Sequence, residues 1–233
     1  MRLYTHPACL GHDPGAGHPE SPARLRAVLA ALDDPRFSAL ERVEAPCATR
    51  EQLERVHDAD YLDGIHASAS AVGYACLDPD TAMSPGSLEA ALRAAGAACA
   101  AADAVLGDET QRAFCAVRPP GHHATRNEAM GFCMFNNIAA AAARALTVHG
   151  LQRVAIVDFD VHHGNGTQDI FGDDSRVLYA SSHQVPLYPG TGAADEHGAG
   201  NIFNAPLPPG AGSSEFRAAW TEKLLPHLDL FRP

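Results

Sequence analysis

The sequence predicts a single α/β domain built on a mainly parallel sheet. Short apolar runs alternate with helical segments along the whole chain, and that alternation is typical of this fold class. The clearest strand is RVAIVDFDV, a continuous β-branched run of the kind that is buried in a parallel sheet. The 233 residues, 46% of them hydrophobic, are enough to enclose a core. Because no internal repeat or linker interrupts the chain, we expect one domain over 1–233.

Local signals place the individual helices and strands. Ser21 followed by Pro22 is typical of a helix start, and Thr49 with Gln52 predicts a capping box. Segments dense in Pro, Gly and Ser are predicted as loops, which applies to 78–87 and 186–212. The predicted helices are 21–34, 49–57, 58–70, 87–107, 137–149, 167–171 and 215–228, and the predicted strands are one within 1–20, 112–117, 153–161 and 176–182.

Composition and charge exclude several classes of protein. Lys and Arg sum to 17 and Asp and Glu to 28, so the net charge is −11, which argues against nucleic-acid binding. No window of eighteen apolar residues predicts a membrane span. The N-terminal segment has no apolar run of the kind found in secretory signals, so we expect a cytoplasmic location.

Side chains capable of chemistry are concentrated after two of the predicted strands. One group comprises His122 and His123, and the other comprises Asp158, Asp160, His162, His163 and Asn165. Open α/β sheets place their sites at the carboxyl ends of parallel strands. We therefore predict that both groups belong to one functional site.

Asp158, Asp160 and His162 follow one another at alternate positions. In an extended segment, residues two apart point the same way, so these side chains are predicted to line one side of the strand as it ends. A carboxylate and an imidazole at this spacing supply two ligands for a transition metal such as zinc. A single Asp or His at a strand end is more often a loop cap or a solvated group, but three together would leave costly unpaired charges. The pattern therefore predicts a metal site.

The pair His122-His123 lies in the segment RPPGHHA, which Pro and Gly make rigid. Adjacent histidines alone are weak evidence, because they could be ligands, acid–base catalysts or solvated residues. With a metal cluster nearby, the economical hypothesis is that they act as a general base and a general acid on metal-bound water.

Four segments closely resemble the arginase/deacetylase superfamily, and more narrowly the class II branch of the zinc-dependent histone deacetylases and its bacterial relatives. They are RPPGHHA (118–124), GFCMFNNIA (131–139), VDFDVHHGNGTQDIF (157–171) and YPGTG (188–192). The likeness extends upstream through HPESPARL (18–25), RVHDADYL (55–62) and DPDTAMSPGSLEAALRAAGAA (78–98), so it spans nearly the whole chain. The resemblance implies a three-layer arginase/deacetylase-like fold with a mainly parallel central sheet.

The resemblance implies zinc-dependent removal of acetyl groups from acetyl-lysine or acetylated polyamines, so the expected partner is an acetylated amine. Asp160 and His162 match two of the three zinc ligands of the family. A potassium ion is also implied, because backbone oxygens of the family bind one at the positions of Asp158, Asp160, His162 and Ser181.

The remaining implied roles concern proton transfer and substrate binding. His122 and His123 match the family's proton-handling histidines, and the residues do not decide which is the acid and which the base. Asp158 matches the carboxylate that holds His122, and Asn165 matches the partner of His123.

The walls of an acyl-lysine channel are implied at three positions. Gly131 and Phe132 match one wall, and Tyr188 stands where the family usually has the opposing Phe. Asp80 matches a loop carboxylate that grips the substrate backbone.

Two functional segments of the family have no counterpart in this sequence. The third zinc ligand is an Asp in a GFDxH-like segment, and a tyrosine that stabilises the oxyanion follows in a Gly-Gly-Tyr-like segment. Two protein ligands make a poor catalytic zinc site, since three are usual. We therefore expect 1–233 to be the N-terminal two-thirds of one histone deacetylase-like domain, incomplete at its C-terminus.

Two alternatives stay open. One is a catalytically incomplete fragment or pseudoenzyme that acts as a binding or scaffold protein. The other is an arginase-like ureohydrolase, whose two-manganese site resembles Asp-x-His-x-Asp. Gly164 stands at the position of the last carboxylate of that pattern, which favours a single catalytic metal.

Overall fold

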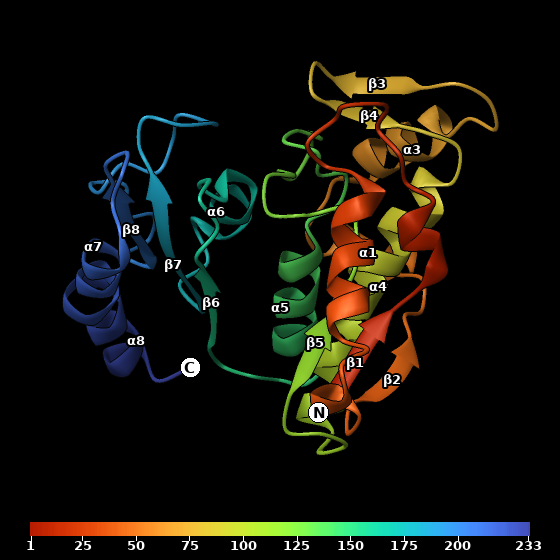
Figure 1. Ribbon diagram of the computed structural model, residues 1–233. Helices are drawn as coiled ribbons and strands as arrows, with labels where there is room; N and C mark the ends of the chain where they lie inside the picture. The colour runs from red at the N-terminus through yellow and green to blue at the C-terminus, as the bar shows by residue number, and fades with distance from the viewer. The chain divides into compact units, whose positions relative to one another are not determined.

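The computed structural model describes all residues, Met1–Pro233, and divides into two compact units, Met1–Ala145 and Leu146–Pro233. Each unit is described by itself (Figure 1). The expectation of one family domain over the whole chain stays a prediction. None of the helices combines the length and the apolarity needed to span a membrane.

The first unit contains most of the helices (Figure 1). Its elements are β1 (Arg2–Thr5), η1 (Pro7–Leu10), α1 (Pro22–Ala31), η2 (Pro35–Phe37), β2 (Glu41–Glu44), α2 (Arg50–Glu54), α3 (Ala59–Ser68), β3 (Ala75–Asp78), β4 (Thr81–Met83), α4 (Ser87–Leu106), β5 (Ala113–Cys115) and α5 (Asn137–Thr147). The short strand β2 was not among the predicted elements.

A parallel sheet in the order β2-β1-β5 forms the centre of this unit. Alternate residues of β1 face opposite sides, as the pleat requires. Leu3 packs in a cluster with Leu25 of α1, and Tyr4 packs in another with Ala97 and Ala104 of α4. Helices therefore cover both faces of the sheet, which confirms the predicted α/β class.

Helix starts in the first unit follow the predicted local signals. Thr49 Oγ1 accepts the Gln52 amide at 3.2 Å, and Gln52 Oε1 accepts the Thr49 amide at 2.8 Å, so the capping box is confirmed. Ser21 is the extended residue before α1, although its side chain does not cap the helix.

The prediction of a loop over 78–87 is wrong in part. β3 and β4 form an antiparallel hairpin, with Ala75 paired to Met83 and Cys76 paired to Ala82. The strands are short and lie close to Pro, Gly and Ser residues, so composition concealed them. Tertiary contacts stabilise their pairing, because Met83 and Leu77 pack in one hydrophobic cluster with residues of α3 and α4.

The second unit is built on a parallel sheet in the order β6-β7-β8. Its elements are β6 (Val154–Asp158), α6 (Asn165–Phe171), β7 (Val177–Gln184), β8 (Ile202–Leu207), α7 (Ser213–Ala218), η3 (Ala219–Leu224) and α8 (Leu225–Phe231). On one side of β7, Leu178 and Ala180 pack against Trp220 and Leu224 of the C-terminal helical segment. The other side carries Tyr179 and polar side chains that lead into the candidate site.

Two predictions for the second unit need correction. Residues 186–212 contain strand β8, and Pro206 lies within it because β8 stands at an edge of the sheet, where a missing N–H is tolerated. The predicted single helix 215–228 is divided by the wider π-helical turn η3. Pro226 follows this turn and has no N–H to donate into a regular helix.

Candidate functional site

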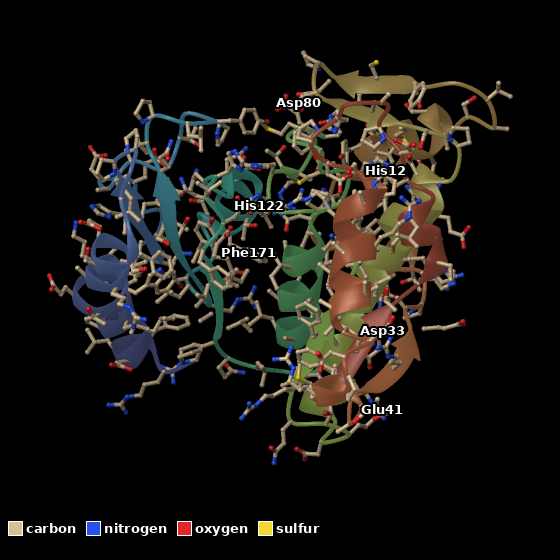
Figure 2. The ribbon with its side chains drawn as sticks, viewed as in Figure 1. His12, Asp33, Glu41, Asp80, His122 and Phe171 are labelled. Atoms are coloured by element: carbon tan, nitrogen blue, oxygen red, sulfur yellow. The ribbon has the colours of Figure 1, made fainter.

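The tandem histidines lie in the segment that connects β5 to α5. His123 is almost fully buried, with 4% of its surface exposed, whereas His122 is half-buried. Their ring centroids are 4.1 Å apart, with an angle of 49° between the planes. In Figure 2, His122 and Asp80 lie toward one end of the first unit, and Asp33 and Glu41 lie toward the other. The histidines therefore lie beyond the carboxyl end of the sheet, as predicted.

Gly131 lies directly against the ring of His123. A Cβ atom built on Gly131 would be 2.4 Å from Cδ2 of His123, and the backbone has a φ of +57°. Phe132 follows with a φ of +69°, a conformation uncommon for a residue with a side chain. Its ring contacts that of His18 edge-on, at 4.7 Å between centroids. These two residues, predicted as a channel wall, form a tightly constrained turn beside His123.

Asp80 lies at the turn of the β3–β4 hairpin and contacts this wall. Its Oδ1 accepts the Gly131 amide at 3.1 Å and the Thr81 hydroxyl at 2.9 Å. Asp78 Oδ1 in turn accepts the Asp80 amide at 2.7 Å. Burial, with the neighbouring Asp80 carboxylate, raises the pKa of Asp78. Asp80 therefore contacts Gly131 of the predicted channel wall. Its contact with substrate stays a prediction.

The predicted metal ligands lie in the second unit, just after β6. The expected strand over 153–161 ends at Asp158, so the explanation by an extended strand is wrong. Asp158 Oδ1 accepts the Asp160 amide at 3.1 Å, and Asp160 Oδ1 accepts the His162 amide at 2.8 Å. These carboxylates bond the backbone two residues ahead and turn the chain out of the sheet.

The turn nevertheless brings the two predicted zinc ligands together. Asp160 Oδ1 lies 3.2 Å from Nδ1 of His162, and both side chains are partly exposed. A carboxylate oxygen and an imidazole nitrogen so close together fit the donors that zinc accepts. The structure contains no group of three or more His, Cys, Asp or Glu side chains with metal-binding geometry.

Tyr179 of β7 fixes the first carboxylate of this segment, and it was not among the residues predicted for the site. Its hydroxyl donates to Asp158 Oδ2 at 3.0 Å and accepts the Gly164 amide at 3.1 Å. The side chain is fully buried, and burial raises the pKa of its hydroxyl well above the usual value. Tyr179 therefore stays neutral and joins the end of β6 to the start of α6.

Substituting Tyr179 with Phe is expected to lower the free energy of unfolding by about 1–3 kcal/mol, because a buried hydrogen-bond bridge is lost while the ring is kept. Urea denaturation measures the difference. Tyr74→Phe is the matched control, since Tyr74 is 59% exposed and should change little. Equal stability of Tyr179→Phe and the unmodified protein would show that the bridge contributes nothing.

The other predicted residues of this unit lie nearby. Asn165 begins α6, and Ser181 Oγ bonds Nδ1 of His183 at 2.9 Å. The ring of Tyr188 contacts that of His162 edge-on, at 6.2 Å between centroids. Gly131 and Phe132 belong to the first unit, so their placement opposite Tyr188 stays a prediction, as do the pairings of His122 with Asp158 and of His123 with Asn165.

Two buried histidines, His163 and His183, lie next to the segment that carries the proposed zinc ligands. Nδ1 of His163 bonds Thr191 Oγ1 at 2.8 Å, and its Nε2 bonds Gln168 Oε1 at 2.9 Å. The ring of His183 lies 4.7 Å from that of His163. Burial lowers the pKa of His163 to about 4. This neutral ring of His163 ties the Thr191 loop to α6. The motif VHHGNG gives no sign of that structural role.

Residues 18–233 match the family model of the histone deacetylase domain, and the chain belongs to this family. Its fold also matches the crystal structure of the HDA15 HD domain with a TM-score of 0.95 and 37% identity, covering 100% of this chain and 71% of that one. The fold class is therefore the α/β, parallel-sheet fold of the arginase/deacetylase type.

Named relatives of this chain occur in bacteria and archaea. The chain is 45% identical over 224 residues to the histone deacetylase-like amidohydrolase of Pseudomonas aeruginosa, which covers 94% of this chain and 59% of the relative. It is 39% identical over 238 residues to a probable deacetylase of Archaeoglobus fulgidus, with 99% and 66% covered. The chain thus spans less than two thirds of the length of either relative.

Proposed function

We propose that this chain carries the proton-transfer residues and two zinc ligands of an amidohydrolase that removes acetyl groups from acetyl-lysine or acetylated polyamines. The observation that carries the proposal is the pair Asp160 and His162, held 3.2 Å apart directly after a parallel strand in a member of the histone deacetylase family. Hydrolysis of an acetyl amide is the chemistry expected from that family and that donor set.

Asp160 and His162 would hold the zinc ion. When bound, zinc polarises the amide carbonyl and lowers the pKa of a bound water. Nearby, backbone oxygens around Asp158 and Ser181 are the proposed potassium site. The Asp158 carboxylate is fixed by Tyr179, which supports a positioning role for the end of β6.

The tandem histidines supply the proton transfers. One of His122 and His123 accepts a proton as water attacks the carbonyl, and the other donates a proton to the leaving amine. Asp158 and Asn165 are proposed to orient them. The burial of His123 and its contact with Gly131 support this role, because a fixed ring transfers protons with little reorganisation.

Substrate binding is proposed at the Gly131–Phe132 wall, with Tyr188 opposite and Asp80 at the rim. The methylene chain next to the acetyl amide of an acetyl-lysine or an acetylated polyamine is apolar, so aromatic walls would bury it. Asp80 would then accept an N–H of the substrate with the lone pairs that its bonds to Gly131 and Thr81 leave over.

The test is acetate release by the purified protein, expressed from its complete reading frame, from an acetyl-lysine peptide and from an acetylated polyamine. A chelator should abolish the release, and added zinc should restore it. His162→Ala should lower kcat/KM at least about 1000-fold, since zinc supplies several kcal/mol of transition-state stabilisation.

His66→Ala is the matched control, because His66 is exposed on α3 in the other unit. Unchanged activity of His162→Ala would show that His162 is not a metal ligand. Absence of acetate release from a zinc-loaded, folded protein would refute the proposed enzyme and favour the scaffold alternative.

A further inference from the structure

The turn that faces His123 is held in an unfavourable conformation. Gly131 and Phe132 have φ values of +57° and +69°, so two consecutive residues occupy the left-handed region. Glycine adopts this conformation freely, whereas a residue with a Cβ atom such as Phe132 does not. Such a conformation persists only where the surroundings determine it.

Two hydrogen bonds from the β3–β4 hairpin hold this turn. The Phe132 amide donates to Thr81 Oγ1 at 3.0 Å, and the Gly131 amide donates to Asp80 Oδ1 at 3.1 Å. The Thr81 hydroxyl donates its own proton to Asp80 Oδ1 at 2.9 Å. One hydroxyl therefore serves both bonds: it accepts from Phe132 and orients the carboxylate that accepts from Gly131.

Water cannot take over this role. Only 1% of the surface of Thr81 is exposed, so the loss of its hydroxyl would leave the Phe132 amide facing a buried methyl group. A buried amide without a partner is costly, and the turn could relieve that cost by rotating toward an ordinary conformation. The rotation would withdraw Gly131 from the ring of His123, which it contacts closely.

We propose that Thr81 is a positioning residue for the reaction, whose hydroxyl holds the Gly131–Phe132 turn against His123. Thr81 touches neither the substrate nor the metal in this assignment and acts through the turn. The proposal deepens the proposed function and rests on it, because it gives the turn the task of fixing a proton-transfer ring and one wall of the substrate channel.

The test compares Thr81→Val, which keeps the shape and removes the hydroxyl, with Thr81→Ser, which keeps the hydroxyl. Thr81→Val should lower kcat about 10- to 100-fold with a smaller change in KM, because the reacting geometry loosens more than the binding of the apolar chain. Thr81→Ser should stay within about threefold of the unmodified protein, since its hydroxyl can make the same bonds.

Thr5→Val is the matched control for a Thr-to-Val change in the same unit. The Thr5 hydroxyl is buried and has no hydrogen-bond partner, so its removal should leave kcat unchanged. Hydrogen exchange of the Gly131 and Phe132 amides, followed by NMR, supplies a second readout. Thr81→Val should accelerate exchange at these amides, and Thr81→Ser should not.

Each outcome decides the proposal. If Thr81→Val keeps full kcat and slow exchange, or if Thr81→Ser is as impaired as Thr81→Val, the hydroxyl does not position the turn. A lower melting temperature with unchanged kcat would reduce Thr81 to a structural role. If the unmodified protein releases no acetate, the proposed function fails, and exchange at the Phe132 amide still tests the hold by Thr81.

Discussion

Replacement of Gly131 by Ala is expected to remove most of the proposed deacetylase activity and to destabilise the first unit. The new Cβ would lie 2.4 Å from Cδ2 and 2.6 Å from Cγ of His123, distances that require a displacement. His123 is buried and cannot simply move into solvent. Left-handed strain adds about 1–2 kcal/mol and overpacking about 1–3 kcal/mol, which gives a loss of about 2–5 kcal/mol in all.

Gly73→Ala is the control that separates strain from collision. Gly73 has a φ of +76°, but a Cβ there would meet nothing within 4 Å. It should therefore suffer the strain alone and keep its kcat. Urea denaturation and acetate release measure both variants. Wild-type kcat in Gly131→Ala would show that contact with His123 does not matter for the reaction.

The closeness of the two proposed metal ligands was predictable because they are local in sequence. Asp160 and His162 are two residues apart, and any compact path of the chain keeps their side chains near each other, as the 3.2 Å contact confirms. The path itself was predicted wrongly. Short carboxylate side chains compete with the sheet for backbone N–H groups, and Asp158 and Asp160 capture the amides that an extended strand would have used.

The supporting residues were not predictable, because their bonds join distant parts of the chain. Thr81 meets Phe132 across 51 positions, and Tyr179 meets Asp158 across 21. Neither residue stands in a pattern that periodicity or spacing would single out. Thr81 lies in a segment predicted as loop, and Tyr179 reads as one more aromatic residue of a buried strand. Only the tertiary structure shows the hydrogen bonds that their hydroxyls make to residues of the candidate site.

The segment RPPGHHA also combines predictable residues with a supporting residue that was not predicted. Its motif pointed to His122 and His123, whereas the residue that anchors it is Arg118 at its start. Arg118 and Glu20 are both buried, with 4% and 1% of their surfaces exposed. Arg118 donates Nε to Glu20 Oε1 at 2.5 Å and Nη2 to Oε2, so the ion pair is bidentate.

Arg118 also ties this segment to the N-terminal loop. Its Nη1 donates to the carbonyl oxygens of Cys9 at 2.8 Å and His12 at 2.9 Å. Burial lowers the pKa of His12 to about 4, so this neighbour stays neutral at pH 7 and adds no charge to the pair. The charge of Arg118 is thus balanced by Glu20 alone among the contacts of its guanidinium.

Glu20→Gln is expected to lower the free energy of unfolding by about 3–5 kcal/mol, because removal of one partner leaves a buried, uncompensated charge. Arg36→Met, which breaks the exposed pair of Arg36 with Asp34, should cost no more than about 1 kcal/mol. Urea denaturation at pH 7 compares the two.

A double change, Glu20→Gln with Arg118→Met, removes the stranded charge and should be less destabilised than Glu20→Gln alone. If the single and double variants were equally unstable, lost packing would account for the effect, and the balance of charge would not.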